Sequence, residues 1–148
     1  MLTDEQARDA VIVALDCTRE RALELTDLLA GHARWVKVGM TLFYRYGPSM
    51  VDEMHARGFK VFLDLKVHDI PFQVKGAVYS ASLSGADILS IHGLGTAQMI
   101  SAGREGAAEA AAERGVDESG RTKLVAISVL TSMDENALHS IGVDGSIK

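Results

Sequence analysis

Cysteine, proline and basic charge are all scarce in this chain of 148 residues. The one cysteine, Cys17, has no second cysteine with which to form an internal disulfide, so nothing indicates an oxidising compartment. Lysine and arginine number 15 against 20 acidic residues, and the net charge of -5 provides no basic field to attract nucleic acid or anionic lipid. We therefore expect neither nucleic acid nor a membrane surface as a partner.

Long apolar runs are also missing. None approaches the roughly 18 residues that a bilayer span requires, and the start MLTDEQARDA is acidic where a secretory signal is basic and then apolar. These features predict a cytoplasmic protein. Hydrophobic residues nevertheless make up 47% of the chain, with only 14 glycines and 2 prolines, which excludes disordered and collagen-like classes and predicts one globular domain over residues 1–148.

Five short runs rich in Val, Ile and Leu lack polar alternation, which is typical of strands buried on both faces of a parallel sheet. They cover residues 11–15, 35–38, 61–65, 87–91 and 124–130. Helical stretches lie between them, and the glycines expected to end these helices are Gly31, Gly58, Gly85 and Gly115. Ser132 and Glu135 have the spacing of a capping box, so we expect a last helix to begin at Ser132.

Such a series forms either an open doubly wound sheet or a closed barrel. The turn LDCTRE after the first run contains no glycine-rich phosphate loop, and Gly93 and Gly95 lack the third glycine of a dinucleotide fingerprint. We therefore predict an α/β fold, a (β/α)8 TIM barrel, of which this chain supplies about the first five βα units. Because a complete barrel takes about 250 residues, we expect the chain to be part of a longer or a split protein.

Charged side chains interrupt the apolar runs near their carboxyl ends. Asp64 and Lys66 in KVFLDLKVHDIP are two apart, so a regular strand directs them to one face, and Asp69 follows in the next loop. Lys37 stands within the apolar run WVKVG and requires a carboxylate from a neighbouring strand, because burying an unpaired ammonium is costly. Asp16 ends the first run.

A structural ion pair is the alternative interpretation of these charges. Buried pairs stabilise only weakly, however, so two lysines and several acids converging at one end of a sheet favour a functional site. Two ammonium groups would repel a divalent cation, and we expect no metal. We interpret His68 and His92 as hydrogen-bonding histidines, and Cys17 as a small core residue rather than a nucleophile.

The segment DLKVHDIP resembles the bacterial orotidine 5'-phosphate decarboxylase family, as do ALD, KVGMTLFYRYGP, SIHG and SVLTS in the other four runs. The resemblance extends from Val11 to about Gly142. The pattern DxKxxD alone is shared with barrel enzymes of sugar phosphates, such as 3-keto-L-gulonate 6-phosphate decarboxylase and hexulose phosphate synthase. Ile70, Pro71 and the text of the second run favour the orotidine branch.

The resemblance implies decarboxylation of orotidine 5'-phosphate to UMP, without a cofactor, in de novo pyrimidine biosynthesis. It implies that Lys66 protonates C6 of the pyrimidine, that Asp64 lies beside the substrate carboxylate, and that Lys37 and Asp16 hold the ribose hydroxyls. It also implies a homodimer with shared active sites, in which Asp69 and Ile70 reach the partner's site. The other substrate-binding residues that it implies are Leu65, Val67, His68, Pro71, Phe72, Gln73 and Thr131, with Ser132 as the alternative to Thr131. The arginine and glutamine that grip the 5'-phosphate in the family match no residue here, and we expect them beyond Lys148.

Two other hypotheses stay open at this point. Lys66 or Lys37 in a barrel strand is also suited to form a Schiff base, as in an aldolase, and a sugar-phosphate decarboxylase of the same barrel type is a related possibility. Alternatively, the chain is an inactive half-barrel that needs a complementary chain. Strands at the two edges of such a half-barrel would have unpaired backbone groups.

Overall fold

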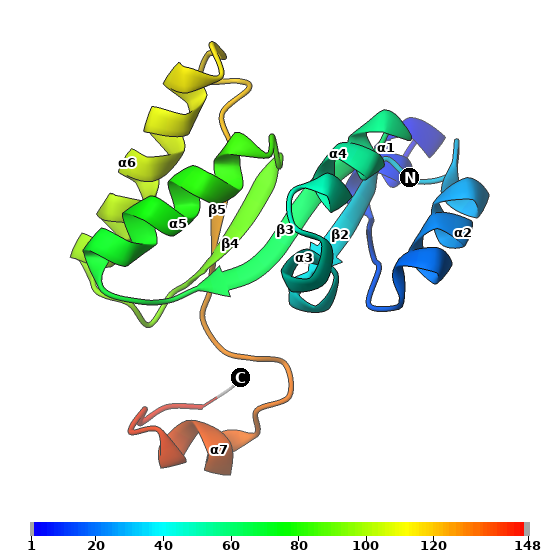
Figure 1. The fold of residues 1–148 in the computed structure, drawn as a ribbon. Helices are drawn as coiled ribbons and strands as arrows, with labels where there is room; N and C mark the ends of the chain where they lie inside the picture. The colour runs from blue at the N-terminus through cyan, green and yellow to red at the C-terminus, as the bar shows by residue number, and fades with distance from the viewer. Residues whose placement is uncertain (1, 147–148) are drawn as a thin grey trace.

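The computed structural model describes residues 2–146, in which five parallel strands alternate with helices (Figure 1). The strands are β1 (Ile12–Ala14), β2 (Trp35–Gly39), β3 (Lys60–Val67), β4 (Ile88–His92) and β5 (Lys123–Ile127). The helices are α1 (Asp4–Ala10), α2 (Arg19–Leu29), α3 (Met40–Tyr46), α4 (Ser49–Ala56), α5 (Pro71–Leu83), α6 (Ala97–Glu113) and α7 (Glu135–Ser140). Each predicted strand is present, with no end shifted by more than three residues.

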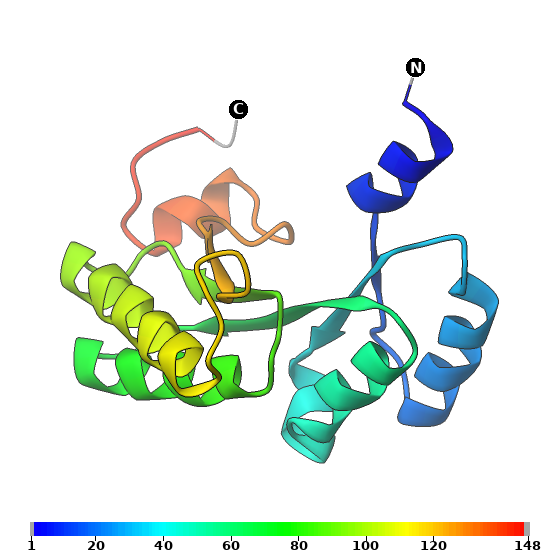
Figure 2. The same cartoon turned by 90° about the horizontal axis from the view of Figure 1, so that it is seen from above.

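The sheet order follows the chain order, β1-β2-β3-β4-β5, with every pair parallel. A doubly wound sheet reverses its order at a switch point, whereas a barrel wall adds each new strand on the same side. Figure 2 shows α2 to α6 on one side of the sheet, as in the outer helical layer of a barrel. The structure thus confirms the predicted α/β class and the five successive βα units.

Local sequence signals account for most helix ends. The hydroxyls of Thr18 and Thr96 accept hydrogen bonds from the backbone amides three residues on, at the starts of α2 and α6. Pro71 occupies the first turn of α5. The four glycines expected to end helices all have positive φ: Gly31, Gly58, Gly85 and Gly115.

The last helix departs from the prediction. It begins at Glu135, not at Ser132, because the side chain of Asp134 accepts the hydrogen bond from the Ala137 amide and so serves as the N-cap. The strand before it ends at Ile127, three residues earlier than expected. In Figure 1, α7 therefore lies beyond the carboxyl end of β5, apart from the layer of α5 and α6.

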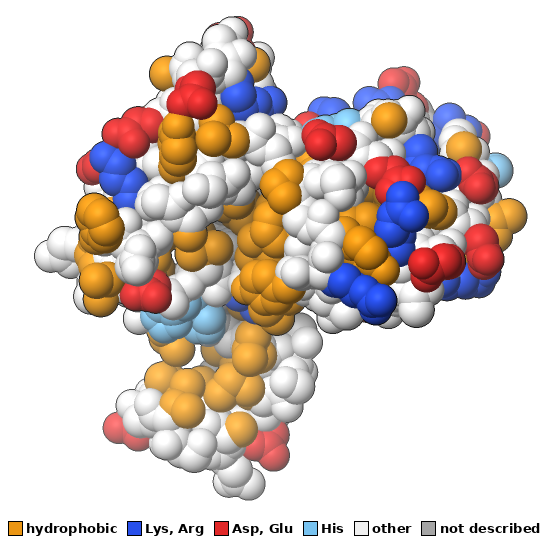
Figure 3. Space-filling view, viewed as in Figure 1, with side chains coloured by type: hydrophobic (Ala, Val, Ile, Leu, Met, Phe, Trp, Pro, Cys, Tyr) orange, Lys and Arg blue, Asp and Glu red, His pale blue; other side chains and the backbone are white. Residues whose placement is uncertain are grey.

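The core is centred on β2, β3 and β4. Val36, Val38, Leu63 and Leu89 are completely buried there. The two outer strands are more exposed than predicted, since each has a neighbour on one side only among the described residues. Hydrophobic side chains also gather at the surface between the α3–α4 and α5–α6 layers and over α7 (Figure 3). Within residues 2–146, no helix combines the length and apolar character needed to cross a membrane.

Candidate active site

Lys37 of β2 lies between two carboxylates. Its Nζ is 2.8 Å from Oδ1 of Asp16, just after β1, and 3.7 Å from Oδ2 of Asp64 in β3. The expectation that this lysine finds carboxylate partners next to its own strand is confirmed. With Lys66 on the far side of Asp64, these four residues alternate in sign, and we call them the charged row.

Lys66 completes the charged row. Its Nζ donates to both carboxylate oxygens of Asp64 at 2.9 Å. The strand geometry that joins the pair differs from the regular alternation expected. Leu63 pairs with Leu89 and Val67 pairs with Ile91, so β3 bulges between these two positions. Lys66 has a φ of 49°, a left-handed conformation that a non-glycine residue adopts only when its surroundings impose it.

The environment of Asp64 favours its charged form. Burial by itself raises the pKa of this carboxyl, but hydrogen bonds from Lys66 and Ser90 and the charges of Lys66 and Lys37 together hold the pKa below its ordinary value. Asp64 is thus a fixed negative charge with cations on two sides. Its side chain is only 12% exposed, against 28% for Lys66, so the ammonium is the more accessible partner.

Gly39 at the end of β2 leaves room for the charged row. It pairs in register with Asp64, and a Cβ at this position would lie 3.0 Å from Oδ1 of Asp16 and 3.4 Å from Nζ of Lys37. A larger residue would therefore press on this ion pair. The sequence gives no direct sign of this role, because the glycine also precedes α3.

Ser90 is a member of the site that the sequence did not reveal. It lies in the middle of β4, completely buried, and its Oγ is 2.8 Å from Oδ1 of Asp64. The only available signal was a polar residue inside the apolar run DILSIH. A buried serine is common enough that this signal alone predicts no site.

His68 and His92 stack at the carboxyl ends of β3 and β4, with ring centroids 4.7 Å apart and planes inclined by 16°. Nδ1 of His92 also accepts a hydrogen bond from the Leu94 amide, which fits the hydrogen-bonding role expected for this residue. Burial, and secondarily the charge of His68, lower the pKa of His92. The stack joins the loops after the two strands.

The loop after β3 and the first residue of α5 carry the next four predicted residues. His68, Asp69, Ile70 and Pro71 line a hollow of about 540 Å³ together with residues 94–96 and Met99. Oδ1 of Asp69 accepts a hydrogen bond from the Ile70 amide, and the described residues show no ion pair between Asp69 and Lys66. Within one chain the charged row therefore runs from Asp16 to Lys66 without Asp69.

The other residues implied by the resemblance are more dispersed. Leu65 is buried in β3 and Val67 is half-buried, whereas Phe72 and Gln73 are exposed in the first turn of α5. Thr131 and Ser132 are exposed in the turn between β5 and α7. The side chains of Phe72, Gln73 and Thr131 are thus not gathered around the charged row by contacts that the structure records.

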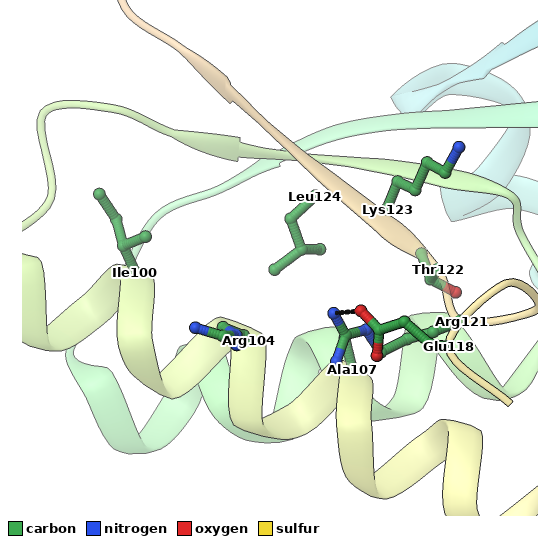
Figure 4. A pocket seen from close by; sticks show the side chains of 8 residues that line it. All are labelled: Ile100, Arg104, Ala107, Glu118, Arg121, Thr122, Lys123 and Leu124. Carbon is green, nitrogen blue, oxygen red and sulfur yellow. Dashed lines mark hydrogen bonds and ion pairs between the residues drawn. The ribbon is translucent and has the colours of Figure 1, made fainter.

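A second hollow of similar size is separate from this chemistry. It measures about 510 Å³ and lies between α6 and the beginning of β5, where Ile100, Arg104 and Leu124 line it (Figure 4). Its charged wall includes Arg121, which pairs with Glu118. Since β5 begins at Lys123, this hollow lies toward the amino end of the strand, away from the charged row.

Comparison with models of known protein families identifies the family of this chain. Residues 9–147 match the family model described as Orotidine 5'-phosphate decarboxylase / HUMPS family. The chain belongs to this family. The family assignment agrees with a parallel barrel-type sheet and with charged side chains gathered toward the carboxyl ends of its strands.

Curated relatives within the family are substantially similar. A protein named orotidine 5'-phosphate decarboxylase from Maridesulfovibrio salexigens is 49% identical over 127 residues, which cover 85% of this chain and 53% of the relative. One of the same name from Halorhodospira halophila is 48% identical over 136 residues, covering 91% and 54%. The chain spans about half the length of the curated relatives that it matches.

A solved structure of the family has the same fold. The crystal structure of orotidine 5'-phosphate decarboxylase from Lactobacillus acidophilus matches with a TM-score of 0.76 and 33% identity. The match covers 90% of this chain and 58% of that chain. The five βα units described above are therefore arranged as in part of a family member.

Proposed function

We propose that this chain supplies the catalytic charges of an orotidine 5'-phosphate decarboxylase, which forms UMP without a cofactor in pyrimidine biosynthesis. The observation that carries the proposal is the ion-paired ammonium of Lys66, held by a bulged backbone beside the buried carboxylate of Asp64. The names of the curated relatives support the orotidine branch of the family.

Decarboxylation breaks the bond between C6 and the carboxylate carbon, and the bonding electron pair stays on C6 as carbon dioxide leaves. Fixed charges must stabilise this pair, since the proposal includes no cofactor to accept it. Lys66 provides the positive charge and then transfers a proton from Nζ to C6, which completes UMP. Solvent reprotonates the resulting neutral amine.

Asp64 faces the carboxylate of the substrate in this proposal. Two like charges 4 Å apart repel by about 4 kcal/mol at an effective dielectric constant near 20. This repulsion is relieved as carbon dioxide leaves, but we assign the larger share of the rate enhancement to the stabilisation of the transition state by Lys66. Lys37 and Asp16 bind the ribose hydroxyls, and Thr131 contacts the base.

The arrangement disfavours a Schiff-base aldolase. A Schiff base begins with attack by a free amine on a carbonyl carbon, whereas Nζ of Lys66 is engaged in hydrogen bonds to both oxygens of the Asp64 carboxylate. Borohydride reduction distinguishes the two chemistries: it traps an aldolase covalently on its substrate and leaves a decarboxylase unmodified. Labelled Lys66 or Lys37 after reduction would overturn the decarboxylase proposal.

The direct test measures the loss of ultraviolet absorbance of orotidine 5'-phosphate. Two preparations are compared: the chain alone, and the chain refolded with a polypeptide that supplies the part of the Maridesulfovibrio relative that it does not match. We expect the chain alone to be inactive and the mixture to turn over, because the edges of β1 and β5 are open in the described residues and binding energy from the 5'-phosphate is needed at the reacting ring. A mixture that associates but does not decarboxylate would contradict the proposal.

We also propose a homodimer in which Asp69 and Ile70 act in the partner's site. Exposure supports this: Ile70 is 63% exposed and Phe72 is 82% exposed, next to an aspartate that forms no ion pair within the described residues of its own chain. Mixing inactive Lys66→Ala and Asp69→Ala dimers and allowing subunit exchange should restore about a quarter of the sites. If activity stays absent while exchange is demonstrated, Asp69 acts within its own subunit.

A further inference from the structure

Ser90 lies opposite the bulge of β3. Leu89 and Ile91 on either side of it pair with Leu63 and Val67, so three residues of β3, from Asp64 to Lys66, face this one serine. Bulged residues lose their regular ladder partners. Ser90 is completely buried, so water cannot take the place of those partners.

The hydrogen bonds of the Ser90 hydroxyl have only one consistent direction. The backbone amide of Lys66 is 2.8 Å from Oγ and can only donate, so Oγ accepts this bond. The single hydroxyl proton is then free for Oδ1 of Asp64, also at 2.8 Å. One side chain thereby connects the backbone of the proposed proton donor to the carboxylate that holds its ammonium.

We infer that Ser90 is a positioning residue of the site: its hydroxyl fixes the bulged backbone of Lys66 and the orientation of the Asp64 carboxylate as one unit. The inference rests on the proposed function for its catalytic meaning. Its physical content, a hydroxyl that couples these two residues, stands on the geometry alone.

The coupling has a chemical purpose at a site that receives an anionic substrate. A second carboxylate approaching Asp64 favours its protonation, and a protonated Asp64 would hold the Lys66 ammonium less firmly. A hydrogen bond donated by Ser90 favours the ionised form and opposes this change. The bond to the Lys66 amide also satisfies a partly buried donor. It thereby supports the left-handed conformation of Lys66, which is costly for a non-glycine residue.

Ser82 provides a matched control for these contacts. It is also a buried serine, 1% exposed, but its Oγ has no hydrogen-bond partner among the described residues. Replacing either serine with alanine removes one buried hydroxyl. Only the replacement of Ser90 should affect Asp64 and Lys66.

The test compares Ser90→Ala, Ser90→Cys and Ser82→Ala by nuclear magnetic resonance, in the chain without substrate. In Ser90→Ala we expect exchange of the Lys66 amide to accelerate about tenfold or more relative to amides of β2, and the titration midpoint of the Asp64 carboxyl to rise by about one unit. The nearly isosteric Ser90→Cys, a weaker hydrogen-bonding group, should shift both in the same direction by less. Ser82→Ala should shift neither.

Turnover is measured separately in the active mixture, that is, the chain refolded with the complementary polypeptide described above. There Ser90→Ala should lower kcat about tenfold or more and leave KM within about threefold. Unchanged Lys66 exchange and an unchanged Asp64 midpoint in both Ser90 variants would overturn the inference. Shifts of the same size in Ser82→Ala would also overturn it, because the effect would then be general loosening. If the two resonance shifts occur but no mixture decarboxylates the substrate, the coupling stands and the proposed function fails.

Discussion

One carboxylate lies toward each end of the sheet, the buried Asp64 and the half-buried Asp87, and each accepts hydrogen bonds and lies beside a basic side chain. At the carboxyl end, Asp64 is bonded by Lys66 and Ser90; at the amino end, Asp87 accepts from the Val61 amide at 2.8 Å and lies 3.2 Å from Nε2 of His55. Burial raises the pKa of both carboxyls, and their hydrogen bonds and neighbouring cations lower both below the ordinary value.

The difference lies in what each carboxylate holds. Besides its contact with the His55 ring, Asp87 holds backbone: its side chain accepts a hydrogen bond from the Val61 amide of β3, and its backbone oxygen accepts one from the Lys123 amide of β5. Asp64 holds the ammonium groups of Lys37 and Lys66, whose side chains are 19% and 28% exposed, at the bulge of β3. A lowered carboxyl pKa therefore does not by itself distinguish the two ends; the proposed function at the carboxyl end rests on the convergence of two ammonium groups on one carboxylate.

The largest expected difference between the two ends concerns turnover. Lys66→Ala in the active mixture should reduce kcat about ten-thousand-fold, because it removes both the proton and the cation facing the developing charge on C6. Binding of the product UMP, measured by calorimetry, should persist. Turnover within tenfold of the parent would show that the carboxyl end has no privileged role.

The amino end should respond in stability instead. Asp87→Ala leaves the Val61 amide without its acceptor and should lower the free energy of unfolding by about 2 kcal/mol, while kcat stays within about twofold. Urea unfolding of the chain measures the first effect. The exposed Asp52→Ala serves as the control and should cost less than about 1 kcal/mol. An Asp87→Ala variant as stable as the parent would contradict the structural role given to Asp87 at the amino end of the sheet.

The sequence predicted the charged row because charged residues are uncommon within the apolar strands of a parallel sheet. A lysine within WVKVG and an Asp and Lys within FLDLK are expensive inside a parallel sheet, and that cost makes them informative. The sequence did not predict Ser90 as a site residue, because a small hydroxyl residue is tolerated in a buried strand. Its importance comes from lying opposite a bulge, and strand register is not visible in the order of residues.

The start of the last helix was predicted wrongly for a similar reason. Ser132 and Asp134 both lie where a helix could start, and the choice between them depends on where β5 ends and how the chain leaves the sheet. The helical run after β2 is likewise divided into α3 and α4 at Gly47, whose φ is 65°, followed by Pro48. The glycines expected to end helices, Gly31, Gly58, Gly85 and Gly115, were predicted correctly, because each has the positive φ of a helix end and no competing signal lies beside it.

The smallest expected effect is on stability at low pH, to which Asp64 and Asp87 should contribute alike. A carboxyl with a lowered pKa binds its proton less readily in the folded chain than in the unfolded chain. Its stabilising contribution is therefore complete above the unfolded pKa and is lost as pH falls through the folded value, which places the loss below about pH 4. Urea unfolding at several pH values from 5 to 3 should show stability falling with pH.

Asp64→Asn and Asp87→Asn should each reduce the slope of this acid-induced loss, although only the first should abolish turnover. The slope measures the difference in bound protons between the unfolded and folded states, and each variant removes one group that contributes to it. Ser82→Ala, which changes no titrating group, should leave the slope unchanged whatever it does to stability. If only one of the two aspartates affects the slope, the two carboxylates are not electrostatic equivalents, and the distinction between the ends extends to the charges themselves as well as to what they hold.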